Sequence, residues 1–525
     1  MSSDAVVYVN ARVLTLDDRD AAATALRVEG GHITHVLDAD DEALSGQRVD
    51  LEGATIVPGL VDAHLHLRSL GRARRSVDLL GAQSADEVIA RIREAAANTP
   101  PGQWIRGRGW DQNDWAETVF PTHEALSAAV PDHPVWLVRV DGHAVWVNAR
   151  AMELAALDAM EAGAPSPEGG EIVRDAEGAP TGIFIDNAMD LLGGALPEDS
   201  AEEIRGDLER AMRLCAQAGV TGVHDMGVGL ETLTELRALE AEGRMPVRVT
   251  VYLAGGAPGV DALLESPPDN EGLLRVVGVK YFSDGALGSR GAALFEDYAD
   301  RPGHRGLLVL STEELTTRAR HAHAAGYQLA IHAIGDQGIA SALDAIAAAV
   351  GDETSHRHRI EHVQVIRAED VPRLASLGVV ASMQPKHATS DMPWAEERVG
   401  PARIRGAYAW RTMERSGAIV AFGSDAPVED HRPALGLYAA ITRQDASGSP
   451  EGGWYPDERL TIEEALLAFT RGPARAVGRD DLGAIRVGAA ADLTLLRRDP
   501  TELTAAELRE LEVVGTIVAG RRIAP

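Results

Sequence analysis

The residues best suited to chemistry are histidines and an aspartate near the ends of apolar runs. His64 and His66 lie in the segment DAHLH, directly after the run IVPGLV. On a strand, residues i and i+2 project to the same face, so the two imidazoles can converge on one ion while Leu65 packs away from it. Two polar residues on a half-exposed strand would give the same spacing. The pair alone therefore leaves both interpretations open.

Three further residues of the same chemical kind end other apolar runs. His332 lies in LAIHAIGD, His362 in RIEHVQV and Asp425 in VAFGSDAP. Each has an ordinary structural interpretation, a hydrogen-bonded histidine or, for Asp425, the cap of a turn fixed by Pro427. If the run ends meet at one edge, however, the five side chains predict a metal site built from histidine and carboxylate.

Lys280 lies inside the apolar segment VGVKYFSDG. A buried ammonium group is costly, so this lysine needs a carboxylate partner, such as Asp284 or a nearby Glu, or must lose its charge. A neutral amine between two metal ions can add carbon dioxide and become a bridging carbamate. Both interpretations stay open at this point.

The elements that would position these residues follow a repeating pattern of apolar strands and helical stretches, which indicates parallel βα units. Eight such strands close a barrel, and the active sites of barrels lie at the carboxyl ends of the strands. The helical stretches include 200–218 and 312–325. The eight predicted strands span 59–67, 220–226, 248–253, 276–284, 328–333, 359–363, 379–384 and 420–425.

The remaining segments predict two further units in this α/β chain. Short β-rich runs before residue 58 and after residue 476 predict a composite β-sandwich domain of residues 1–58 and 476–525. Residues 59–475 then form the (β/α)8 TIM-type barrel. The gap between its first two strands far exceeds an ordinary loop, which predicts an inserted subdomain at about 72–200 that is rich in Trp, Pro and Gly.

An ordered set of motifs resembles the amidohydrolase superfamily, and particularly its YtcJ-like branch, which includes N-substituted formamide deformylases. The resemblance runs from about residue 5 to the end of the chain, and it departs from the pattern at Lys386. The motifs are PGLVDAHLHL (58–67), RGRGWDQNDW (106–115), DGHAVWVN (141–148), GVTGVHDMG (219–227), VKYFSDGALGSR (279–290), IHAIGDQ (331–337), RIEHVQ (359–364), SMQPKH (382–387) and FGSDAPVE (422–429).

The resemblance implies a two-metal site and a role for each ligand. His64, His66 and Asp425 would bind the more buried ion, His332 and His362 the second, and carboxylated Lys280 would bridge the two. Zinc is the usual ion, although iron or manganese also suits this ligand set. Metal lowers the pKa of bound water toward ~7, which supplies hydroxide for attack on a carbonyl. Asp425 would take the proton from that water and deliver it to the leaving amine.

The resemblance also implies residues around the metals. We expect Trp110, Asp111 and His143 to line the substrate pocket, although Trp110 and Trp146 would equally form the core of the insert. His224 and Asp225, which we expect near the end of the second strand at the same mouth, and Asp284 are candidates for orienting the ligands. Lys386 is either a cation that favours an anionic substrate or a solvent-facing loop residue.

Composition excludes several classes of protein. The net charge of −30 over 525 residues argues against nucleic-acid binding. The sole cysteine, Cys215, excludes an internal disulfide and a cysteine-based metal site. The opening residues and the lack of a long apolar run predict a soluble, cytoplasmic protein with no membrane contact. Only two of the 50 basic residues are lysines, which with the acidic balance suggests a halophilic source or a GC-rich genome.

We therefore predict an enzyme, an amidohydrolase-type hydrolase of C–N bonds other than peptide bonds. Its small-molecule substrate would be an amide, an N-substituted formamide or a cyclic amide. One alternative is a mononuclear, deaminase-like site of His64, His66, His332 and Asp425, and another is an ester or lactone hydrolase. A non-catalytic barrel that binds or regulates is the alternative of another class. A homodimer is left open.

Overall fold

The computed structural model describes residues 5–17, 23–37, 45–155 and 162–524. Parts of the predicted 1–58 and 476–525 segments and of the insert lie outside these residues. Within the described residues, no helix is both long and apolar enough to cross a membrane.

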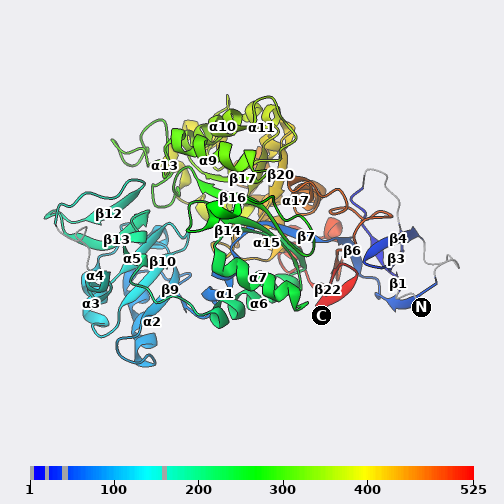
Figure 1. Ribbon diagram of the computed structural model, residues 1–525, viewed down its shortest axis with the longest axis horizontal. Coiled ribbons are helices and arrows are strands. Elements are labelled where there is room, and N and C mark those ends of the chain that lie inside the picture. The colour runs from blue at the N-terminus through cyan, green and yellow to red at the C-terminus, as the bar shows by residue number, and fades with distance from the viewer. Residues whose placement is uncertain (1–4, 18–22, 38–44, 156–161, 525) are drawn as a thin grey trace.

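The centre of the molecule is an eight-stranded parallel sheet, in the order β20-β19-β18-β17-β16-β15-β14-β7 (Figure 1). Neighbours in this order pair in parallel throughout, and helices cover the outside of the sheet. The predicted barrel is thus confirmed as a nearly closed, eight-stranded parallel barrel. Its strands are β7 (Leu60–Leu65), β14 (Val220–Val228), β15 (Arg248–Ala254), β16 (Leu274–Phe282), β17 (Gln328–Ala333), β18 (Arg359–His362), β19 (Val380–Met383) and β20 (Ile419–Phe422).

The segment after β20 meets the end of β7 and brings the barrel close to closure. The backbone N–H of Asp425 donates to the carbonyl of His64 at 2.6 Å, and that of His66 donates to the carbonyl of Ala426 at 2.9 Å. Gly423 permits this approach, because a Cβ atom there would lie 2.4 Å from the backbone nitrogen of His64. The first and last strands of the barrel therefore supply neighbouring residues to one site.

The helices around the barrel begin and end where their sequences indicate. Helix α6 (Ala201–Gln217) begins with a capping box between Ser200 and Glu203, and it buries its apolar face against the barrel. Helix α9 (Thr312–Ala324) is capped by Ser311, and Gly326 follows its end with a φ of +82°. Both predicted helices are present within a residue of their predicted bounds. The other long helices are α7 (Leu230–Ala241) and α10 (Asp336–Val350).

Between β7 and β14 the chain forms a separate six-stranded sheet, in the order β12-β13-β11-β10-β9-β8. Trp110, Trp115 and Trp146 are buried in an apolar cluster beside this sheet. The sheet lies at one side of the barrel (Figure 1). Its strands are β8 (Val77–Asp78), β9 (Ile105–Trp110), β10 (Val135–Arg139), β11 (Ala144–Val147), β12 (Gly170–Arg174) and β13 (Pro180–Asp186).

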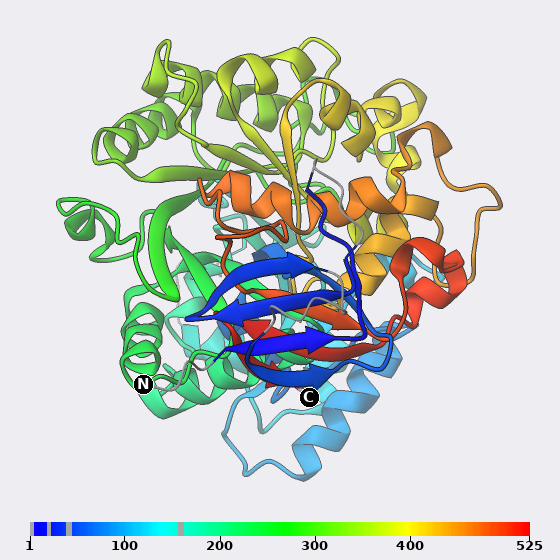
Figure 2. The ribbon, with the colours of Figure 1, turned by 90° about the vertical axis from the view of Figure 1, so that its right-hand side faces the viewer.

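The two ends of the chain meet in a pair of sheets on the other side of the barrel. One sheet has the order β4-β3-β1-β5, and the other has the order β2-β6-β21-β22-β23. Figure 2 shows the blue N-terminal strands lying beside the red C-terminal strands. Residues from both ends share one apolar cluster, for example Leu26 and Ile56 with Leu493 and Ile517. The strands are β1 (Val6–Val9), β2 (Arg12–Val13), β3 (Ala25–Glu29), β4 (His32–Leu37), β5 (Gln47–Asp50), β6 (Thr55–Pro58), β21 (Leu493–Leu496), β22 (Val513–Val518) and β23 (Arg521–Ala524).

Candidate metal centre

The predicted ligands lie at the carboxyl ends of barrel strands. His64 is the last residue but one of β7, and His66 directly follows that strand. His332 is near the end of β17, His362 ends β18, and Asp425 lies three residues beyond β20. Because the strands are parallel, these ends share one mouth of the barrel.

The first group of possible ligands is His64, His66 and Asp425, whose ligand atoms all lie within 4.8 Å of one another. Nε2 of His64 is 3.5 Å from Oδ1 of Asp425, and Nε2 of His66 is 3.2 Å from the same oxygen. Nδ1 of His66 is 2.8 Å from the carbonyl of Met226, which can only accept, so Nδ1 carries the proton. A neutral His66 therefore offers its Nε2 lone pair to the site.

The second group is His362, His387 and Asp425, again within 4.8 Å. Nδ1 of His362 donates to Oε1 of Gln384 at 2.9 Å, and the rings of His362 and His387 stack with centroids 5.9 Å apart. The ring of His332 lies beside them, with its centroid 4.6 Å from that of His362. Its Nε2 is 3.3 Å from the carbonyl of Gly285, which can only accept, so Nε2 carries the proton. In the neutral ring the lone pair is then on Nδ1.

His387 was not singled out in the sequence, although it ends the motif SMQPKH. It lies in α12 (Pro385–Asp391), which follows β19 and begins at a proline. The motif indicated that this segment is functionally important. It could not predict the direction of the His387 side chain, because that direction depends on how α12 packs over the mouth of the barrel. His387 is the ligand candidate that sequence reasoning missed.

Orphaned polar atoms show that these residues fit a metal ion. Within the described chain, Nε2 of His64, Nε2 of His387 and Oδ1 of Asp425 are buried and have no hydrogen-bond partner. Buried polar atoms without partners are rare, because each costs about 1–3 kcal/mol. One cation in each of the two ligand groups would satisfy all three, because Asp425 belongs to both groups.

Burial favours the neutral form of His64, His332 and His362. It lowers the pKa of His64 to about 4, with a further contribution from the charge of Lys280. Burial likewise lowers the pKa values of His332 and His362 well below 6.5, and in each case a neighbouring histidine adds to the effect. Neutral imidazole is the form that binds a metal.

A buried ion pair holds His64 in place. Nδ1 of His64 lies 2.6 Å from Oε2 of Glu361, and Nε of Arg359 donates to Oε1 of the same carboxylate at 2.5 Å. Arg359 also donates to the carbonyl of Ala63 at 2.7 Å and to the hydroxyl of Ser382 at 2.6 Å. Although burial opposes ionisation, Arg359 and His64 hold the pKa of Glu361 far below its ordinary value. Neither Glu361 nor Arg359 was singled out in the sequence, although the motif RIEHVQ contains both.

Lys280 lies on β16 inside the barrel and is 1% exposed. Among the described residues no carboxylate lies within ion-pair distance of its amine, and its Nζ is 5.1 Å from the centre of the Phe282 ring. Burial lowers its pKa to about 8. The alternative of a pair with Asp284 is not found, since Asp284 instead accepts hydrogen bonds from the backbone of Ala293, Ile334 and Gly335 at 2.8–3.0 Å.

The residues predicted to orient the ligands occupy three different places. Asp284 lies 3.7 Å from Nε2 of His332. Asp225 accepts from the backbone N–H of Leu67 at 2.9 Å, directly beside His66. His224 is at the middle of β14, because this strand extends to Val228, and its Nδ1 lies 2.9 Å from Nη1 of Arg359. Arg359 and Glu361 connect it to His64.

A cavity of about 670 Å³ opens above the candidate ligands. Asp111 and His143 line it, as predicted for a substrate pocket. Nδ1 of His143 is 2.6 Å from Oδ1 of Asp186, and this carboxylate, against the effect of burial, raises the pKa of His143. Trp110 does not line the cavity among the described residues; its side chain is fully buried beside Trp146. That position argues against the predicted contact between Trp110 and substrate.

Cations also reach this cavity. Lys386 lines it, and its amine lies 3.4 Å from Oε2 of Glu429, so its charge is matched. Arg139 forms ion pairs with Asp111 and Asp141. Arg108 donates to the carbonyl of Val140 at 2.9 Å and has no carboxylate within 4 Å among the described residues. Arg108 therefore brings to the mouth a positive charge that no ion pair within the described chain matches.

The fold and the site define a barrel enzyme with histidine and carboxylate ligands at its mouth, and comparisons with known proteins identify the family. A model described as the amidohydrolase family matches residues 47–524. The putative amidohydrolase YtcJ of Bacillus subtilis is 33% identical over 481 residues, 90% of each chain. The N-substituted formamide deformylase of Arthrobacter pascens is 32% identical over 546 residues, 98% of this chain and 97% of that one.

A solved structure is similar to this chain in both sequence and fold. The crystal structure of an uncharacterized metal-dependent hydrolase from Pyrococcus horikoshii is 31% identical, with a TM-score of 0.78 over 95% of this chain and 99% of that one. The chain belongs to the amidohydrolase family, which makes it a hydrolase. The resemblance stated from the motifs is confirmed.

Proposed function

We propose that the protein is a metal-dependent hydrolase of a non-peptide C–N bond in an amide, an N-substituted formamide or a cyclic amide. The observation that carries the proposal is that two ligand groups share Asp425 and include buried ligand atoms of His64, His387 and Asp425 that have no hydrogen-bond partner. Family membership and the deformylase relative, whose name states its reaction, support the bond type.

We assign the residues to two divalent ions, which we take to be zinc, with iron or manganese as alternatives that the same ligands accept. His64, His66 and Asp425 would hold one ion. His362 would hold the second, with His332 and His387 beside it. Lys280 would bridge the ions as a carbamate, formed when its neutral amine adds carbon dioxide and releases one proton. Its burial without a carboxylate partner and its lowered pKa support this role.

Divalent ions would supply two effects here, a lower pKa for water and polarisation of the scissile carbonyl. The protein's own residues supply the proton transfers and the binding of substrate. Asp425 lies between both ligand groups, where its carboxylate can take a proton from the attacking water and pass it to the leaving amine. His143, with its pKa raised by Asp186, presents a donor to the cavity that can hold the substrate carbonyl or carboxylate.

Metal content and turnover together test the proposal. Protein purified without added metal or chelator is expected to hold about two equivalents of a divalent ion, and it should release amine from at least one member of a panel of formamides, N-acyl amines and lactams. One equivalent, unchanged in Lys280→Met, would favour the mononuclear alternative. Turnover confined to esters and lactones would overturn the bond type. Bound metal with no turnover on any substrate would favour the non-catalytic barrel.

A further inference from the structure

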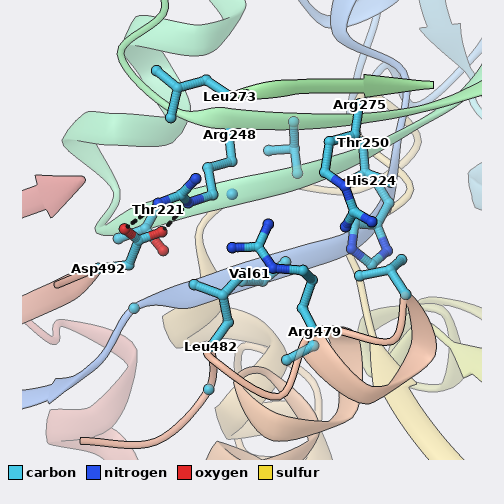
Figure 3. Close-up of a pocket in the computed structure, with 16 residues that line it drawn as sticks. Val61, Thr221, His224, Arg248, Thr250, Leu273, Arg275, Arg479, Leu482 and Asp492 are labelled. Atoms are coloured by element: carbon cyan, nitrogen blue, oxygen red, sulfur yellow. Dashed lines mark hydrogen bonds and ion pairs between the residues drawn. The ribbon is translucent and has the colours of Figure 1, made fainter. Parts of the chain in front are cut away.

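A second, much smaller cavity lies at the opposite end of the barrel from the candidate metal centre. Its volume is about 30 Å³, and it is lined by the first residues of several barrel strands and by the segment after α17 (Arg471–Ala476). Arg248 is the first residue of β15, and Arg275 is the second of β16, which places the cavity at the amino ends of the strands. Figure 3 shows this cavity and the side chains around it.

Three arginines reach into the same space, with Asp492 at one end and His224 at the other (Figure 3). Nε of Arg248 lies 2.6 Å from a carboxylate oxygen of Asp492, and Arg479 lies equally close to Asp481. Arg275 differs, because it has no carboxylate within 4 Å among the described residues. The cavity therefore carries one guanidinium charge that no ion pair matches.

Within the described residues, the side chain of Arg275 donates hydrogen bonds to neutral oxygens of Asn270. Its Nε donates to the carbonyl of Asn270 at 3.0 Å and one terminal nitrogen donates to the side-chain oxygen of Asn270 at 3.1 Å. Burial lowers the pKa of Arg275, and the charges of Arg479 and Arg248 add to that effect. Asp492 and Asp481 match the charges of Arg248 and Arg479, so the group keeps one positive charge that attracts an anion.

His224 adds a neutral donor to the same cavity. Its Nδ1 lies 2.9 Å from Nη1 of Arg359, and a guanidinium can only donate, so Nδ1 accepts and the proton is on Nε2. The side chain is 3% exposed and lines the cavity. Among the described residues Nε2 has no protein acceptor, which makes it a second, independent group that calls for a ligand.

We propose that this cavity binds one small monovalent inorganic anion of the size of chloride. The unmatched charge of Arg275 and the Nε2–H of His224 supply the recognition. The volume limits the ligand, since one water needs roughly 10–15 Å³ of such space and a cavity of about 30 Å³ has no room for a phosphate ester or an organic acid. Water alone would accept the hydrogen bonds but would leave the charge of Arg275 unmatched.

Bromide locates the site directly. Crystals of the metal-loaded protein soaked in sodium bromide should show an anomalous peak between Arg275, Arg479 and His224. The absence of a peak there, with bromide seen only on the protein surface, would overturn the proposal. This measurement needs no variant and is independent of turnover.

Thermal unfolding at constant ionic strength tests the same site in solution. Replacing sodium gluconate by sodium chloride is expected to raise the Tm of the protein in a saturable manner, because an anion that binds only the folded state stabilises it. In Arg275→Gln the chloride affinity should fall roughly 10- to 100-fold, the usual effect of losing a charged hydrogen bond.

The matched control is Arg415→Gln, which removes a positive charge at an exposed position of α14 (Trp410–Arg415). This variant should keep the full chloride dependence. An equal chloride dependence in Arg275→Gln and the unaltered protein would contradict the site. If Arg275→Gln does not fold, Arg275→Lys, which keeps the charge, takes its place and should retain a weakened response.

Discussion

Two imidazoles and one carboxylate face one another at the mouth of the barrel. Nδ1 of His66 donates a hydrogen bond to the carbonyl of Met226, and Nδ1 of His64 lies 2.6 Å from the carboxylate of Glu361. Both rings therefore turn their Nε2 lone pairs toward Oδ1 of Asp425. When both rings are neutral, three acceptors lie this close together, and a cation among them would satisfy all three.

Asp425→Asn tests the proposed proton transfer. The amide has nearly the volume of the carboxylate, so Tm in the absence of metal should change little. Turnover should fall about 10²- to 10⁴-fold, the usual contribution of a general acid–base. Measurements of kcat and metal content in this variant check the prediction.

The control for this variant is Asp352→Asn, at an exposed position in the turn after helix α10. It should retain full turnover and metal content. If Asp425→Asn keeps turnover within threefold of the unaltered protein while metal stays bound, Asp425 is not the proton carrier.

Glu361→Gln tests the buried pair behind His64. Removing one partner leaves Arg359 buried without a matching charge, which costs about 3–5 kcal/mol of unfolding free energy. Metal affinity should also fall about 10- to 100-fold, because His64 loses the group that orients it. Urea unfolding and metal competition with a chelator measure the two effects.

The contribution of Glu361 to the free energy of unfolding should depend on pH in one direction. The folded pKa of Glu361 lies far below its ordinary value of 4.5, so its contribution to stability is present above pH 4.5 and is lost as the pH falls below it. The stability difference between the unaltered protein and Glu361→Gln should therefore be constant from pH 6 to 7 and shrink below pH 4.5. The control Glu369→Gln removes an exposed carboxylate 3.2 Å from Arg367 and should change stability by less than about 1 kcal/mol. An equal loss in both variants would contradict the argument.

At the scale of single residues, the sequence could predict His64 and His66 because the alternation of a strand is a local property. It could not predict the roles of Arg359 and Glu361, since two charged residues on a short strand usually face solvent. Both are fully buried here only because the barrel surrounds them. The position of Trp110 likewise depends on the packing of the insert.

At the scale of elements, the eight barrel strands could be predicted from apolar runs, and the site followed from their parallel order. Their ends were less predictable. Strand β14 continues two residues beyond the predicted Met226, so His224 lies within the strand and contributes to the opposite end of the barrel. Helix α12 places His387 over the mouth, and such a placement depends on contacts between elements rather than on local sequence.

Gly423→Ala tests how closely the last strand of the barrel approaches the first. The added methyl group would lie 2.4 Å from the backbone nitrogen of His64, so the segment after β20 must move away from β7. Overpacking of this kind costs about 1–3 kcal/mol. Because Asp425 and His64 lie on these two segments, metal affinity should fall together with stability.

The control is Gly206→Ala in helix α6, where an added Cβ atom meets open space. That variant should be unchanged or more stable by up to about 1 kcal/mol, since alanine favours a helix. Urea unfolding and metal titration compare the two variants. Equal stability and equal metal affinity in both would show that the approach at Gly423 is not tight.

At the scale of the whole molecule, we propose that residues 1–58 with 476–525, the barrel and the insert at about 72–200 act as three structural units. The shared cluster of Leu26, Ile56, Leu493 and Ile517 supports the first unit. The tryptophan cluster and six-stranded sheet support the insert. The insert contributes Asp111 and His143 to the cavity above the candidate ligands, so we expect it to govern substrate choice.

The net charge of −30 predicts that salt stabilises the folded protein. Like charges on a compact surface repel one another more than on an unfolded chain, and salt screens that repulsion, with a Debye length of about 10 Å at 0.1 M and about 3 Å at 1 M. Urea unfolding is the suitable measurement, because urea is uncharged. The unfolding free energy should rise between 0.05 and 1 M salt to a similar extent in sodium gluconate and sodium chloride, with only a small additional gain from chloride at the cavity beside Arg275. A steady fall in both salts would mean that surface ion pairs outweigh the repulsion, and the acidic composition would then reflect something other than adaptation to a salty medium.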